Sequence, residues 1–136
     1  MKNVIWGLLI AVLVAGVGWQ ALRFSRNRLD AKVAKFNSDA ENLGVGLQQY
    51  KEFVGSYPTG NNVDIAKALS GRTEKKVLIL AVRKSDINSK GEIVDPWGTP
   101  LQFYISGNGV LIRSAGPNKV WEDSTVATFD DLFRSN

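Results

Sequence analysis

The chain has 136 residues, enough for one ordinary domain, and it contains neither cysteine nor histidine. This composition excludes disulfides, thiol nucleophiles, imidazole bases and zinc sites built on these residues. The net charge of +4 lies in residues 1–35, which hold six Lys/Arg and one Asp, whereas residues 36–136 hold eleven Lys/Arg and twelve Asp/Glu. A nucleic-acid-binding domain needs a basic face, so we expect no nucleic-acid partner.

An apolar run begins at Val4 and ends at Leu22, with a tryptophan near each end, as is usual at membrane interfaces. As a helix, its 19 residues would rise about 28 Å, close to the ~30 Å hydrocarbon core of a bilayer. A retained transmembrane anchor over residues 1–24 is the favoured interpretation. The alternatives are a signal peptide cleaved after Gly16-Val17-Gly18 and a buried core helix.

Residues 25–56 are predicted to continue the anchor as an amphipathic helix. Eight apolar residues follow one another at alternating steps of four and three, which places them on one stripe. They are Leu29, Val33, Phe36, Ala40, Leu43, Leu47, Tyr50 and Val54. One continuous helix from about residue 3 to about residue 54 is predicted. Its stripe is expected to pack on the protein's own sheet, with a dimeric coiled-coil seam as the alternative. Gly44 and Gly46 mark either a bend or a close neighbour.

Residues 57–136 are predicted to form a small globular domain, which makes the fold class α+β: a long helix packed on a small antiparallel sheet. The expected elements are a short helix over 63–69, a strand or buried helical turn over 77–82, and a hairpin of strands 101–105 and 110–113. Gly and Asn in residues 106–109 indicate the hairpin turn. Trp97 is expected to cover one end of this hairpin, and residues 114–131 are expected to form a polar loop.

Signatures of catalysis are missing from the sequence. It contains no phosphate-binding G-x-x-x-x-G-K-[ST] loop, no G-x-S-x-G elbow and no S-x-x-K pair. The carboxylate pairs Glu122-Asp123 and Asp130-Asp131 lie in a polar loop, where an apolar pocket that would raise a carboxyl pKa is hard to build. We therefore expect no enzymatic activity.

The same carboxylates suit a hard cation. Calcium takes six to eight oxygen ligands in a flexible geometry. The loop offers Asn118, Asp123, Asp130 and Asp131 as metal ligands, together with a backbone carbonyl near Ala115, and Glu122 is the reserve ligand. The alternative interpretation is a solvated acidic loop that binds nothing.

The order of the motifs resembles a known family. Tyr-Pro-Thr-Gly (57–60) ends the long helix, and Asp-Pro-Trp-Gly-Thr-Pro (95–100) precedes the hairpin. Ile-Arg-Ser-Ala-Gly-Pro-Asn (112–118) then leads to Asp-Asp-Leu (130–132). Over residues 40–132 this arrangement resembles the major, G-type pseudopilin of type II secretion systems, within the type IV pilin superfamily.

The resemblance implies a pilin-like fold, in which a helical spine carries a small antiparallel sheet and a calcium-binding loop follows the last hairpin. Family members bundle their N-terminal helices into a short periplasmic fibre that works like a piston. The implied function is a membrane-anchored structural subunit of a type II secretion or type IV pilus-like system. The implied partners are the lipid bilayer and other pseudopilin-like subunits, including copies of itself. The alternative is an unprocessed, membrane-tethered periplasmic binding or adaptor domain with the same fold and no fibre role.

Two features depart from the family pattern. Family precursors carry a basic leader, a Gly cut by prepilin peptidase, and a Phe and a Glu beyond it, whereas here Gly7 precedes Leu8 and no acidic residue occurs before Asp30. The usual processing site and the acidic residue used in fibre assembly are therefore both missing. In addition, Asn118-Lys119 stands where the family usually has Asp-Gly, which predicts a weaker calcium site because affinity follows ligand charge.

The basic residues beside the apolar run bear on localisation. Positive-inside counting sets Lys2 against the five Lys/Arg of residues 23–35 and favours a cytoplasmic domain. The resemblance favours a periplasmic domain. We expect a single-pass protein of the bacterial inner membrane with its globular domain in the periplasm.

Overall fold

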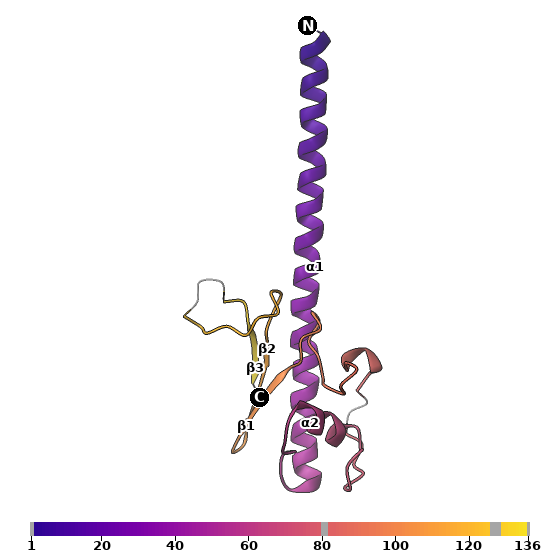
Figure 1. The fold of residues 1–136 in the computed structure, drawn as a ribbon, viewed down its shortest axis with the longest axis vertical. Helices are drawn as coiled ribbons and strands as arrows, with labels where there is room; N and C mark the ends of the chain where they lie inside the picture. The colour runs from indigo at the N-terminus through magenta and orange to yellow at the C-terminus, as the bar shows by residue number, and fades with distance from the viewer. Residues whose placement is uncertain (1, 80–81, 126–128, 136) are drawn as a thin grey trace. The chain divides into compact units, whose positions relative to one another are not determined.

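The computed structural model describes residues 2–79, 82–125 and 129–135, with side chains from Gln20 onward. The chain divides into two compact units, Met1–Val33 and Ala34–Asn136. Helix α1 (Lys2–Val54) begins in the first unit and ends in the second (Figure 1). The second unit also contains helix α2 (Asn62–Leu69), a 3₁₀ turn (Lys84–Asp86), and strands β1 (Gln102–Ser106), β2 (Gly109–Ser114) and β3 (Leu132–Ser135). The predicted α+β class, with one long helix and a small antiparallel sheet, is confirmed.

The first unit is the N-terminal part of α1. Its large described apolar side chains before Val33 are exposed: Leu22 by 71%, Phe24 by 63% and Leu29 by 41%. Within the residues whose side chains are described, no helix is both long and apolar enough to cross a membrane. The anchor predicted over residues 1–24 lies mostly outside these residues.

The C-terminal part of α1 carries the core of the second unit. Five residues of the predicted stripe are buried there: Phe36, Ala40, Leu43, Leu47 and Tyr50. The stripe is thus buried within the chain's own domain from Phe36 to Tyr50, whereas Leu29 is exposed. Its packing on the sheet stays a prediction. No atom lies within 4 Å of the position that a Cβ on Gly44 would take, so no close neighbour requires glycine there.

The start of α2 is fixed from both sides. Asn61 and Asp64 form a capping box, because the Asn61 side chain accepts from the Asp64 N–H and the Asp64 carboxylate accepts from the Asn61 N–H. The Asn62 amide then donates to the carbonyls of Ile93 and Leu101, at 2.9 and 2.7 Å, and accepts from the Ile93 N–H at 2.6 Å. One side chain therefore ties the helix start to two distant segments.

The predicted hairpin is confirmed. Strands β1 and β2 pair antiparallel and close at Ser106 opposite Gly109, with Gly107 at a φ of 56° in the two-residue turn. The Tyr57 hydroxyl, from the motif that ends α1, lies 3.0 Å from the Asn108 carbonyl and 2.8 Å from the Gln48 side-chain oxygen. The motif thereby joins α1 to the tip of the hairpin.

One strand was not predicted, and one expectation about a strand is corrected. Strand β3, which follows the predicted polar loop, pairs antiparallel with β2 and completes the order β1-β2-β3. In residues 77–82, the described positions contain no strand beyond an isolated bridge between Leu78 and Ser70. Leu78 is 68% exposed, so this apolar stretch does not form the buried element that its composition predicted. Residues 80–81 lie outside the described residues.

Candidate metal centre

The turn of residues 95–100 is organised by one buried carboxylate. Asp95 is 4% exposed, and its Oδ1 accepts from the N–H groups of Trp97 and Thr99, each at 2.9 Å. Its Oδ2 accepts from the Ser114 hydroxyl at 2.6 Å. Asp95 therefore holds its own turn closed and fixes the end of β2, where the acidic loop begins.

The beginning and the end of the acidic loop meet at Gly116. The Ser114 hydroxyl also accepts from the Gly116 N–H at 3.0 Å. Gly116 has a φ of 68°, and a Cβ on it would lie 2.3 Å from the Asp130 carbonyl oxygen and 2.9 Å from Asp130 Oδ1. Glycine is needed here both for the backbone conformation and for the close approach.

Three carboxylates gather where the loop returns to the sheet. Glu122, Asp130 and Asp131 each offer one oxygen, and these oxygens lie within 4.8 Å of one another. The Asp130 N–H donates to Glu122 Oε2 at 3.2 Å, which orients the two residues. These three residues are called the acidic cluster. It contains two of the four predicted ligands, Asp130 and Asp131, together with the reserve ligand.

The other two predicted ligands serve the loop locally. Asn118 is exposed, and its side-chain oxygen accepts from the Val120 N–H at 2.7 Å. Asp123 is exposed too, and its Oδ1 accepts from the N–H and the hydroxyl of Thr125, at 3.1 and 3.2 Å. The structure places Asp123 outside the acidic cluster. Between them, Lys119 is exposed and adopts a φ of 63°.

A guanidinium lies against the acidic cluster. Arg113 Nε donates to Asp131 Oδ2 at 2.6 Å, and its Nη2 forms an ion pair with the same oxygen and donates to the Glu122 carbonyl. The rings of Trp121 and Phe133 each lie 5.2 Å from the guanidinium carbon. The strand register explains this position, because Arg113 pairs with Phe133 and is therefore diagonal to Asp131 on the same face.

Arg113 was not predicted from the sequence to be a functional residue. The available signal was its place as the last charged residue of a strand that leads into an acidic loop. Burial lowers the pKa of its guanidinium, but hydrogen bonds and Coulomb attraction from Asp131 and Tyr104 outweigh burial and leave the pKa above its ordinary value. The guanidinium therefore stays charged throughout the pH range of a folded protein.

The acidic cluster fits a calcium ion by spacing and by chemistry. Two oxygens on opposite sides of a calcium ion, bound at 2.3–2.6 Å, are about 5 Å apart, which matches the 4.8 Å limit of the cluster. The Asp131 side chain is fully buried, yet its Oδ1 has no hydrogen-bond partner among the described residues, and Asp130 Oδ1 is likewise buried without one. Buried polar atoms are nearly always paired, so these two oxygens point to a ligand.

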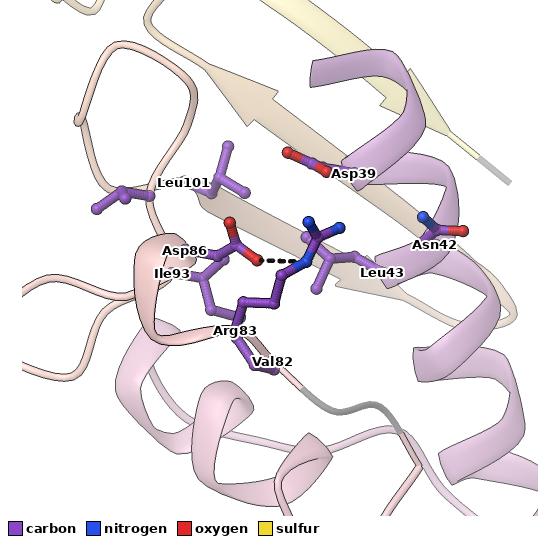
Figure 2. Close-up of a pocket in the computed structure, with 9 residues that line it drawn as sticks. Asp39, Asn42, Leu43, Val82, Arg83, Asp86, Ile93 and Leu101 are labelled. Atoms are coloured by element: carbon purple, nitrogen blue, oxygen red, sulfur yellow. Dashed lines mark ion pairs between the residues drawn. The ribbon is translucent and has the colours of Figure 1, made fainter. Parts of the chain in front are cut away.

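A separate small cavity lies between α1 and the segment that follows residue 81, all within the second unit (Figure 2). Its volume is about 70 Å³, which admits a few water molecules, whereas sites for organic ligands usually exceed 300 Å³. Arg83 and Asp86 pair across its wall at 3.8 Å. It is lined by Asp39, Asn42, Leu43, Val82, Arg83, Asp86, Ile93, Val94 and Leu101.

Comparison of the chain with protein-family models, with curated proteins and with solved structures yields no match.

Proposed function

We propose that this protein is a membrane-anchored, pilin-like structural subunit without catalytic activity, belonging to a type II secretion or type IV pilus-like system of the bacterial inner membrane. The observation that carries the proposal is the contrast along α1. In the second unit the apolar stripe is buried by the chain's own domain, whereas in the first unit Leu22, Phe24 and Leu29 are exposed.

Exposed apolar side chains that share one face of a helix indicate a surface that a partner covers, whereas a single exposed one is ordinary. Leu22 and Leu29 are seven residues apart and so share a face of α1. The apolar run before them has the length of a bilayer span. The proposal therefore places residues 1–24 in the lipid bilayer, the following turns of α1 against neighbouring subunits, and the globular domain in the periplasm.

The absence of cysteine allows a direct test of subunit contact. Leu29→Cys introduces a single thiol on the turns of α1 that follow the anchor, on the face that Leu22 and Leu29 share. In isolated membranes that carry the full chain, oxidation is expected to convert this variant to a disulfide-linked dimer, because fibre subunits pack through this part of the helix. The matched control is Phe53→Cys, which replaces a 75% exposed phenylalanine at the other end of α1 and is expected to stay monomeric.

Three results would contradict this function. Release of the chain from membranes by alkaline carbonate would show that residues 1–24 do not anchor it. Protection of the globular domain from protease in spheroplasts would show that this domain lies in the cytoplasm. A chain that stays in the membrane with an exposed domain, but gives no dimer at Leu29→Cys and no filaments by electron microscopy, would be the tethered adaptor and not a fibre subunit.

We further propose that the acidic cluster binds one calcium ion through Glu122, Asp130 and Asp131, with backbone carbonyls and water completing the six to eight ligands. The two buried, unpartnered carboxylate oxygens support this proposal. Bound calcium would supply the positive charge that holds the three acids together and would fasten the end of the loop to β3.

Calcium is expected to stabilise the full chain by about 2.7 kcal/mol when it is in hundredfold excess over its dissociation constant. Thermal melts in calcium and in chelator measure this effect. Asp130→Asn is expected to abolish the calcium-dependent rise of the melting temperature. Asp123→Asn makes the same chemical change outside the cluster and is expected to keep the rise. A wild-type midpoint that does not move in millimolar calcium would leave a solvated acidic loop.

A further inference from the structure

The acidic cluster already contains a positive charge from the protein itself. The Arg113 guanidinium contacts Asp131 Oδ2 and the Glu122 carbonyl, so it joins the middle of the loop to its end, the same two parts that a bound ion would join. It is held between the rings of Trp121 and Phe133, and its side chain is only 18% exposed. A planar, bidentate guanidinium in such a setting is a fixed part of the site and not a surface charge.

This arrangement has opposite effects on the free and the ion-bound loop. Without an ion, Arg113 neutralises one of three clustered carboxylates and leaves a formal charge of −2 on the four side chains. With an ion bound, the guanidinium and the calcium would both contact Asp131. Two positive charges at such a short distance repel each other strongly where water is excluded. The same residue therefore stabilises the empty site and opposes the filled one.

We propose that Arg113 is a resident cation of the acidic cluster: it keeps the loop closed without a metal ion and lowers the affinity of the cluster for calcium. The proposal rests on the calcium site proposed above and describes its regulation. It makes the loop largely independent of calcium at low concentration and confines binding to environments rich in the ion.

The test compares variants of the full chain in detergent micelles, with calcium chloride as the titrant in isothermal calorimetry. Arg113→Gln is expected to bind calcium at least tenfold more tightly than wild type, and its metal-free form is expected to melt at a lower temperature. Arg113→Lys keeps the charge and is expected to stay within about threefold of the wild-type dissociation constant. The matched control is Arg134→Gln, because Arg134 lies on the neighbouring strand and pairs with Glu41 at 3.5 Å.

The outcomes separate the two proposals. If Arg113→Gln and wild type bind with the same affinity while Asp130→Asn does not bind, the calcium site stands and the role of Arg113 is overturned. If no variant binds calcium, the site itself is overturned and the inference falls with it. If Arg113→Gln is unfolded without metal, calcium is expected to restore its folded circular-dichroism spectrum, and failure to do so overturns the inference.

Discussion

Replacing Trp97 with alanine is expected to lower the free energy of unfolding by about 3–5 kcal/mol, the usual loss for a buried tryptophan. Trp97 is 9% exposed and belongs to the core, as the sequence predicted. Its backbone N–H donates to Asp95 Oδ1, so the turn fixes the backbone from which the ring projects. Chemical denaturation of the full chain, followed by circular dichroism of the globular domain, measures the change.

Phe53→Ala is the control for this measurement. Phe53 is also aromatic but 75% exposed, and its truncation is expected to change the free energy of unfolding by less than about 0.5 kcal/mol. If Trp97→Ala unfolded at the same denaturant concentration as Phe53→Ala, the burial of Trp97 would contribute nothing and its ring would be available to a ligand.

Replacing Asp95 with alanine is expected to lower the free energy of unfolding by about 3 kcal/mol. The change leaves two buried N–H donors and one hydroxyl without their acceptor, and each such loss typically costs about 1–3 kcal/mol. Ser114→Ala removes one of these bonds and is expected to cost about 1 kcal/mol. Because the two residues share a hydrogen bond, the double variant is expected to lose less than the sum of the single losses.

Asp123→Ala provides the comparison for Asp95. Asp123 also accepts from a backbone N–H two residues ahead, but it is exposed, and water replaces the lost contact. Its truncation is expected to cost less than about 1 kcal/mol. Strict additivity of the Asp95 and Ser114 losses would show that the hydrogen bond between them does not couple the turn to the acidic loop.

The helices and the hairpin could be predicted from the sequence because each rests on local pattern. The stripe from Phe36 to Tyr50 follows from helical periodicity, and the turn at Gly107 follows from residues that tolerate positive φ. The capping box at Asn61 and Asp64 likewise lies within a few residues of the helix it starts. In these elements the local signals agree with the tertiary structure.

Strand β3 could not be predicted because its four residues carry no alternating pattern of their own. It forms because its backbone pairs with β2, a partner about twenty residues earlier in the chain. The prediction for Val77 to Val82 is wrong for the opposite reason: the apolar composition indicates a buried element, but Leu78 is exposed. Burial depends on neighbours in space, which composition does not specify.

The candidate site could be predicted only in part for the same reason. Asp130 and Asp131 were identified because carboxylates are crowded into an irregular polar loop, and they do lie in the cluster. Asn118 and Asp123 also offer side-chain oxygens, but these accept hydrogen bonds from the loop's own backbone. The position of Arg113 depends on the register of β2 against β3. Because β3 was not predicted, the contact between Arg113 and the acidic cluster could not be predicted either.

Lys119 has a left-handed backbone conformation, which strains the loop at this residue. A φ of 63° disfavours a residue with a side chain by roughly 1–2 kcal/mol relative to the right-handed region, and glycine avoids this penalty. The neighbouring contacts impose the conformation, since the Lys119 N–H donates to the Gly116 carbonyl at 3.2 Å. The loop thus keeps a glycine-like shape with a lysine in it. Any condition that loosens the Asp95–Ser114–Gly116 connection releases this strain and favours the opening of the loop before the rest of the domain unfolds.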